Sequence, residues 1–359
     1  MNTRMIVLSL AALLSFFFES CKNNDPEPNL PPSAFTVTAK MAASGTDVVL
    51  TWTKAKDPNG DPVTYAVVYK DTLAKNLTDT TYTIKNVAYS TTVAGTVVAS
   101  DNQKASTPAS FSITSGVNPY VTIPDVNFEK ALVAAKIDDV QDGKLLITNA
   151  QKVTRLDVAS KQIASLQGVE TFTNLLYLDI RSNALTTVDI SKATSLTALL
   201  GNDNKLTGLD VSKNVALKYL DCSSNMLIAL DVSKNTALNN LTCSVNKLIS
   251  LDVSQNTALT DLDCKSNSLT TLDVSKNAKL GILYCGTNKL TALDVSKNTA
   301  LTYLDCSINQ LTALDLKTNT VLQGMVSTKN SIQTICVADA SKIPSAWRKD
   351  ATATYQVCQ

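Results

Sequence analysis

Five cysteines recur every twenty-one residues in the second half of the chain: Cys222, Cys243, Cys264, Cys285 and Cys306. A regular row of thiols could hold metal ions, form disulfides or supply nucleophiles. Each cysteine follows a leucine by two positions, and alternate residues of an extended run share one face, so both side chains point inward. Stacked runs present parallel side chains, whereas zinc needs converging ligands and a disulfide needs Cβ atoms that face each other. The spacing therefore predicts buried packing residues, with no metal and no cofactor.

Composition narrows the chemistry further. The chain of 359 residues contains no histidine, which excludes histidine-dependent triads, metal sites and general bases. Its 32 basic and 31 acidic residues give a net charge of +1, so no basic footprint indicates nucleic acid. The sequence also lacks a P-loop lysine motif and a glycine-rich dinucleotide fingerprint. Binding and carboxylate chemistry remain.

The cysteines belong to a longer repeat that covers about half of the chain. Eight asparagines share their spacing: Asn183, Asn204, Asn225, Asn246, Asn267, Asn288, Asn309 and Asn330. Most close an L-x-x-L-x-[C/I]-x-x-N unit, such as Leu301–Asn309, and an L-x-x-L-D-V-x-x-N unit, such as Leu290–Asn298, fills the gap between them. The doubled pattern resembles the nested (IRREKO-type) class of bacterial leucine-rich repeats, and internalin-like proteins. This resemblance implies a solenoid over residues 153–337, in which each coil has two short extended runs and asparagine amides satisfy backbone groups at the turns.

The segments beside the repeats predict caps, because a solenoid must cover its apolar ends. Within residues 120–152, the amphipathic stretch Ile123–Ile137 predicts a helix with Asp125 as its N-cap. The next residues resemble part of a calcium loop, but the twelfth position is Asn149. Residues 338–359 form the other cap. In an oxidising compartment we expect a disulfide between Cys336 and Cys358.

Residues 34–116 predict a small antiparallel β-sandwich. The β-branched and aromatic runs Val48–Trp52, Val63–Tyr69, Thr80–Ile84 and Thr91–Ser100 are separated by turn-rich segments. Trp52, the strand with Tyr65 and Tyr69, and the VVASD ending resemble a fibronectin type III domain. The segment Asp57–Pro62 predicts a plain turn, since Val68 stands where a calcium loop needs glutamate. The predicted fold class is thus mainly β, a fibronectin type III-like sandwich followed by a leucine-rich repeat solenoid with short helical caps.

The start of the chain has the pattern of an export signal. Arg4 precedes the apolar run Met5–Phe18, which is too short to span a bilayer, where about twenty apolar residues are needed. Ser20-Cys21 at its end resembles a bacterial lipoprotein cleavage site. The resemblance implies a signal peptide over residues 1–21 and lipidation of Cys21, and the Pro-rich residues 22–33 predict a tether. The lysine and acidic residues just after Cys21 resemble the export signals of Bacteroidetes-type surface lipoproteins, which implies an anchor in the outer membrane and exposure at the cell surface. The alternative is an ordinary signal peptide with an incidental cysteine.

The outward positions of the two runs differ in their variation from coil to coil. In the second run the outward residue is aspartate throughout, which favours a solvated structural face. In the first run it changes, and we select as candidate ligand-binding residues Tyr177, Tyr219, Asp261, Asp263, Tyr284, Tyr303 and Asp305. Exposed tyrosines among acids are typical of recognition surfaces, because tyrosine buries area while keeping a polar tip. The alternative is that these are tolerated strand residues of high β-propensity.

Three functions follow from this pattern. The first is a cell-surface binding protein that uses the repeat sheet for protein recognition, in adhesion or host interaction. The second is a glycan-binding accessory protein with Tyr219, Tyr284 and Tyr303 as stacking platforms. The third is a carboxylate enzyme using Asp261, Asp263 and Asp305. No insertion interrupts the repeats to build a pocket around these acids, so we expect no enzyme.

Overall fold

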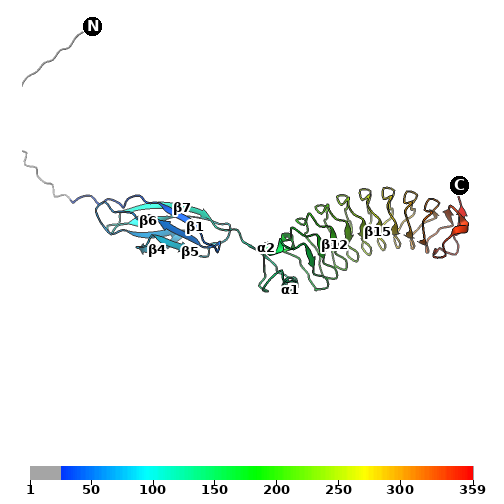
Figure 1. Ribbon diagram of the computed structural model, residues 1–359, viewed down its shortest axis with the longest axis horizontal. Helices are drawn as coiled ribbons and strands as arrows, with labels where there is room; N and C mark the ends of the chain where they lie inside the picture. Colours follow the sequence, from blue (N-terminus) through cyan, green and yellow to red (C-terminus); the bar gives the residue numbers. More distant parts are fainter. Residues whose placement is uncertain (1–25, 359) are drawn as a thin grey trace, which may run out of the picture. The chain divides into compact units, whose positions relative to one another are not determined.

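The computed structural model describes residues 26–358, so the predictions for the signal peptide and Cys21 lie outside the described residues. The chain divides into two compact units between Asn118 and Pro119. Figure 1 follows the chain from the strands of the first unit into the stacked coils of the second. Both units consist mainly of β-structure.

The first unit contains two antiparallel sheets around one core. Their orders are β1-β2-β5 and β4-β3-β6-β7. The strands are β1 (Val37–Met41), β2 (Val48–Trp52), β3 (Thr64–Tyr69), β4 (Asp71–Leu77), β5 (Thr81–Ile84), β6 (Thr92–Ser100) and β7 (Ser106–Thr114). The Tyr65 ring lies 5.4 Å from that of Trp52 and 5.7 Å from that of Phe35, and its hydroxyl accepts the Ala55 N–H at 2.8 Å. The buried phenol thus keeps a polar partner.

The second unit begins with a cap. Strands β8 (Tyr120–Thr122) and β9 (Lys144–Leu146) pair around helix α1 (Val126–Ala134), and the short α2 (Ile147–Ala150) follows. Asp125 is the N-cap of α1, as predicted. Its Oδ1 accepts the N–H groups of Asn127 and Phe128, and its Oδ2 accepts those of Ala164 and Ser165. One carboxylate therefore starts the helix and ties it to the first coil.

The repeats form a parallel sheet of nine three-residue strands. In order these are β10 (Arg155–Asp157), β11 (Tyr177–Asp179), β12 (Ala198–Leu200), β13 (Tyr219–Asp221), β14 (Asn240–Thr242), β15 (Asp261–Asp263), β16 (Ile282–Tyr284), β17 (Tyr303–Asp305) and β19 (Gly324–Val326). The central residue of each strand is buried, and with the cysteines and the second-run valines it forms one continuous core. The spacing of twenty-one residues thus sets the register of the stack.

The second extended run of each coil differs from our expectation. Among the described residues it becomes a strand only near the C-terminal end, at β18 (Ala313–Asp315). In earlier coils a tight turn follows it, because each run-two aspartate accepts the N–H two residues later, as Asp252 does from Ser254 at 2.8 Å. Buried asparagines then bridge the coils. Asn256, for example, donates from Nδ2 to the carbonyls of Val232 and Asn235.

The asparagines of the first run hold a second turn. The residue before each one has a positive φ, such as Val245 at 54° and Ile308 at 52°, a conformation that β-branched residues rarely adopt. The Nδ2 of Asn309 donates to the carbonyls of Cys285 and Cys306, and its Oδ1 accepts the Leu290 N–H. Nδ2 of Asn309 also donates to the Ser307 carbonyl, and each of the eight asparagines makes at least three such side-chain bonds, which explains why the residue recurs.

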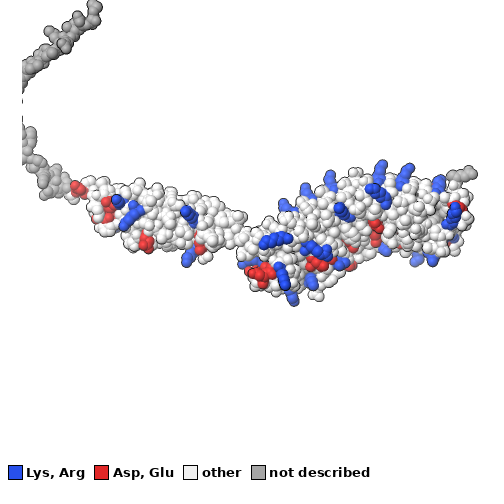
Figure 2. Space-filling model, in the orientation of Figure 1, with Lys and Arg blue, Asp and Glu red and all other residues white. Residues whose placement is uncertain are grey.

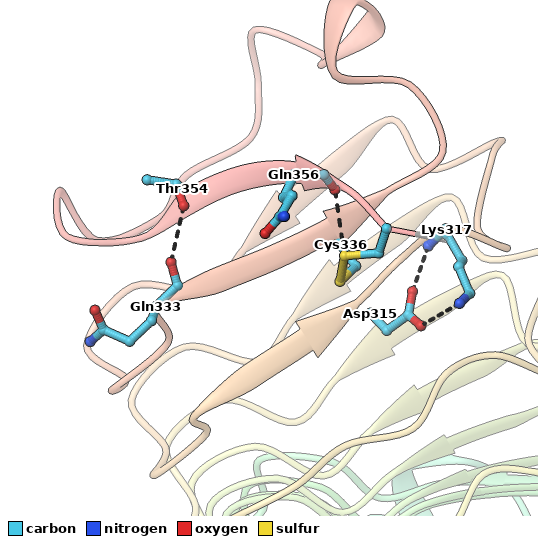
Figure 3. The surroundings of a disulfide bond; sticks show 7 residues. Asp315, Lys317, Gln333, Cys336, Thr354 and Gln356 are labelled. Carbon is cyan, nitrogen blue, oxygen red and sulfur yellow. Dashed lines mark hydrogen bonds and ion pairs between the residues drawn. A yellow bond between two sulfur atoms is a disulfide. The ribbon is translucent and has the colours of Figure 1, made fainter.

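The C-terminal cap closes the stack. Strands β20 (Thr334–Val337) and β21 (Thr354–Val357) continue from β18 as a parallel sheet, with a 3-10 turn at Ala340–Lys342 between them. A disulfide joins Cys336 to Cys358 (Figure 3). At the other end of β21, the N–H of Thr354 donates to the Gln333 carbonyl at 3.0 Å. The last strand is thus fixed at both ends.

Candidate binding surface

The outward residues of the nine-stranded sheet form two columns, one on each side of the buried leucines. Strand register aligns Asp261, Ile282 and Tyr303 in the first column. The second column aligns Asp263, Tyr284 and Asp305. The predicted aromatic and acidic residues of the C-terminal coils therefore lie together on one face.

An aromatic pair is the centre of this face. The ring centroids of Tyr284 and Tyr303 lie 5.2 Å apart with their planes tilted by 46°. A Cβ on Gly324 would come within 2.6 Å of the Tyr303 ring, so the ring rests on glycine backbone. Lys265 Nζ lies 5.5 Å from the Tyr284 centroid. The two rings are therefore held in place before any partner arrives.

The neighbouring acids differ in their environment. Partial burial raises the pKa of Asp263, although the Lys265 N–H and the Ser244 hydroxyl donate to it. Asp305 accepts both the N–H and the hydroxyl of Ser307, at 3.0 and 2.6 Å. Burial, with the nearby Asp305 charge, raises the pKa of Tyr303, whose phenol stays protonated and able to donate at neutral pH. The face offers carboxylate acceptors and phenol donors.

Tyr177 and Tyr219 lie in more N-terminal coils and do not join the pair. Arg155 stacks its guanidinium 3.5 Å from the Tyr177 centroid, and the Tyr177 hydroxyl donates to the fully buried Asp179 at 3.4 Å. Arg181 pairs with the same carboxylate at 3.2 Å. Tyr177 thus belongs to a structural cluster at the start of the sheet. Tyr219 is 37% exposed and stands alone between Ala198 and Asn240.

The five repeat cysteines are free, and each is fully buried. Desolvation raises the pKa of every one of these thiols, that of Cys306 to about 12. A thiol with such a pKa carries almost no thiolate at neutral pH, so it is a poor nucleophile and metal ligand. Within residues 26–358, three or more His, Cys, Asp or Glu side chains do not converge as a metal site would require.

The aspartates of the second run form hydrogen bonds within their own turns. Their carboxylates accept backbone N–H groups and serine hydroxyls two residues later, which lowers the pKa of Asp210, Asp231, Asp252 and Asp273. The uniform column is thus explained by turn formation.

Figure 2 shows lysine and arginine side chains projecting singly along the repeats. None of the helices within the described range has the length and apolar character needed to span a bilayer.

A second surface was missed by our sequence reasoning. Met226, Ile228, Val245 and Ile249 are exposed by 36%, 63%, 50% and 68%, and they lie on two successive turns that follow the strands. These turns stack directly, because the Lys247 N–H donates to the Leu227 carbonyl at 2.8 Å. We call these four residues the apolar edge patch. The replacement of threonine by isoleucine at positions 228 and 249 could have identified this patch from the sequence. Other coils carry threonine at the corresponding positions: Thr186, Thr207, Thr270, Thr291 and Thr312.

The stacked coils make the second unit a parallel β-solenoid that is like a leucine-rich repeat domain. The chain is similar to the functional domain of InlJ from Listeria monocytogenes, which includes a cysteine ladder. The two are 32% identical, over 65% of this chain, with a TM-score of 0.44, and the match spans only 62% of the InlJ chain. It is also similar to internalin C2 of Listeria monocytogenes (17% identity, 66% of this chain and 95% of that one, TM-score 0.45). The Leptospira interrogans leucine-rich repeat protein LIC12759 matches at 23% identity over 52% of this chain and 58% of its own, with a TM-score of 0.42. No family model matches the chain, and no curated protein matches it.

Proposed function

We propose that this chain is a non-enzymatic, surface-anchored binding protein that recognises a protein partner through its repeat sheet. The observation that carries the proposal is the Tyr284–Tyr303 pair beside Asp263 and Asp305 on an open sheet. Aromatic anchors held rigidly among hydrogen-bonding groups are typical of interaction hot spots. The rest of each coil repeats almost unchanged, so the residues that vary from coil to coil are mainly the outward ones of the sheet, where a partner would bind.

The chemistry of the surface describes the partner. Carboxylates at Asp261, Asp263 and Asp305 suit basic or hydroxyl-bearing groups, and the two rings suit a cation or an apolar side chain. The apolar edge patch adds exposed aliphatic area, which favours a protein over a glycan. A glycan-binding role stays as a second candidate, because two adjacent tilted rings also fit the apolar face of a sugar.

The remaining parts of the chain complete this proposal. Lipidation at Cys21 would anchor the protein in a bacterial outer membrane, and residues 22–33 would tether it. The first unit, with sheets of three and four antiparallel strands, fits a fibronectin type III-like spacer. Such an arrangement presents the repeats away from the membrane, as adhesion or host interaction requires.

The binding face is tested by paired substitutions. The recombinant chain is screened against extracellular proteins and, in parallel, against a glycan array. For the ligand found, Tyr284→Ala with Tyr303→Ala is expected to weaken binding by about 2 kcal/mol or more, roughly thirtyfold. The matched control, Asp252→Asn with Asp273→Asn, keeps an acceptor at each turn and is expected to bind as wild type. Loss of binding in the control pair alone would place the interface on the other face.

The anchor is tested in cells. A fatty-acid probe is expected to label the wild-type protein and to leave Cys21→Ser unlabelled, with both forms present at equal abundance. Equal labelling of the two would rule out Cys21 as the lipidation site.

A further inference from the structure

A cavity of about 240 Å³ lies where the last coil meets the C-terminal cap. Its wall is formed mainly by Leu316, Asn319, Leu322, Val337, Ile343 and Trp347. Asp339 and Lys342 also line it and pair with each other at 3.2 Å, so the lining carries no net charge. Sites for drug-sized ligands measure roughly 300–1,000 Å³, so this one suits a smaller, fragment-sized molecule. Most of the lining is aliphatic or aromatic, and polar groups at a few points decide what can enter.

The cavity lies where the buried asparagine column ends. From Asn214 onward, the second-run asparagine of each coil donates to two carbonyls of the preceding turn, as Asn319 does to Val295 and Asn298 at 3.1 and 2.9 Å. The next asparagine would stand at position 340 and would reach the carbonyls of Leu316 and Asn319. Residue 340 is alanine, and the chain turns away there as the 3-10 turn Ala340–Lys342.

Those two carbonyls therefore lack the amide that their counterparts receive. Each accepts one backbone N–H, from Asn319 and Leu322 at 3.0 and 3.1 Å, and a carbonyl oxygen has a second lone pair to offer. One further polar atom of the lining, Trp347 Nε1, is buried without a hydrogen-bond partner among the described residues. Asn319 Oδ1 also lacks one, but it shares this with the five asparagines before it in the column. Asn319 is only 2% exposed. A buried polar atom without a partner costs about 1–3 kcal/mol, which a ligand could recover.

These groups select one chemical class. The two carbonyl acceptors disfavour a carboxylate, since Lys342 is already paired with Asp339, and a buried ammonium would leave the indole N–H unmatched and carry a large desolvation cost. A primary carboxamide has two N–H donors for the carbonyls and an oxygen that accepts from the indole. We propose that this cavity binds the primary carboxamide of a compact, largely apolar ligand, with its NH2 group toward Leu316 and Asn319 and its body against Leu322, Val337 and Ile343.

The test uses the full chain labelled with 15N on its tryptophans. The chain has two, Trp52 and Trp347, and the Trp347→Phe spectrum assigns their indole signals. Benzamide is the probe, and benzoate and toluene are the matched controls. Saturable movement of the Trp347 signal with benzamide, and at least tenfold weaker binding of both controls, is expected. The Trp52 signal, from the other unit, should stay fixed.

Two variants separate the site from its fold. Trp347→Phe keeps an aromatic wall without the N–H and is expected to weaken benzamide binding about three- to tenfold, as loss of one hydrogen bond implies, with binding followed on the ligand signals. Val337→Phe fills the cavity and is expected to abolish binding, with the thermal transition measured alongside. A further titration with N-acetylglutamine methylamide distinguishes the sources. Binding as tight as that of benzamide assigns the site to a side chain of a partner protein, and weaker binding assigns it to a free small amide. Equal binding of benzoate, or no response to benzamide, would overturn the proposal.

Discussion

At the residue scale, one position in the cysteine column holds a serine whose polar group is buried. Ser327 stands where five earlier coils have cysteine, is 1% exposed, and its hydroxyl has no hydrogen-bond partner among the described residues. Ser327→Cys is expected to raise the free energy of unfolding by about 1–2 kcal/mol, because it replaces an unsatisfied hydroxyl with a weakly polar thiol. Urea denaturation measures the change. Ser307→Cys, which removes a hydroxyl bonded to Asp305, should stabilise nothing.

Two aspartates predict opposite dependences on pH. Burial raises the pKa of Asp263, so folding favours its protonated form. That contribution to stability is present below the ordinary value of about 3.9 and is lost as pH rises through the raised value. Asp263→Asn is therefore expected to be more stable than wild type at pH 7, and the difference should vanish in acid. Thermal unfolding at a series of pH values measures it.

The pKa of Asp252 is shifted in the opposite direction, so its contribution to stability changes with pH in the opposite sense. Hydrogen bonds from the N–H and hydroxyl of Ser254 lower its pKa. Its contribution is present above the ordinary value and is lost as pH falls through the lowered one. Asp252→Asn is thus expected to be slightly less stable than wild type at pH 7. If both variants shifted in the same direction at neutral pH, the assigned environments would be wrong.

At the scale of elements, the disulfide is the covalent tie of the C-terminal cap. It closes a sequence separation of 22 residues around β20 and β21. Replacing both cysteines, Cys336→Ser with Cys358→Ser, is expected to cost about 3 kcal/mol, mainly by freeing the unfolded chain. Hydrogen exchange should show early loss of protection in β21, with the central coils nearly unchanged. Reductant should affect the wild type and leave the double variant as it was.

The repeat sheet could be predicted from sequence because its signal is periodic and redundant. The leucine, cysteine and asparagine positions each mark the same spacing, and the structure places all three in the core or the turns. Strand β4 could not be predicted this way. Its residues are mostly polar and exposed, so no apolar alternation marks it, and only pairing with β3 makes it a strand.

The second extended run shows another limit of the sequence. L-D-V alternates as a strand does, but its aspartate and asparagine bond locally and across coils, and these side-chain bonds replace a ladder. The candidate site was predictable in part. Variation identified Tyr284 and Tyr303, whereas the stacking of Arg155 on Tyr177 and the support of Tyr303 by Gly324 depend on contacts between coils that no single repeat contains.

At the scale of the whole molecule, each coil of the solenoid contacts mainly its neighbours, so stability is close to a sum over coils. Deleting residues 232–252, one full period, joins Asp231 to Val253 and restores the same L-D-V sequence. This variant is expected to fold cooperatively, with a smaller dependence on denaturant because less surface is exposed on unfolding. Circular dichroism and urea titration measure both properties. Deleting residues 232–251, one fewer, shifts the apolar residues that follow by one position, from the inward to the outward face, and should prevent a cooperative transition.

The buried cysteines also make the local opening of the solenoid measurable by chemical labelling. A thiol that is fully enclosed and strongly protonated reacts with an alkylating reagent only while its coil is open. The alkylation rate of each of the five thiols therefore reports how often its own coil opens. Mass spectrometry can measure the five rates separately. Fraying from the ends would make Cys306, one coil from the cap, react first and Cys243, in the middle coil, last. One shared rate would instead mean that the coils open together, as a single cooperative body.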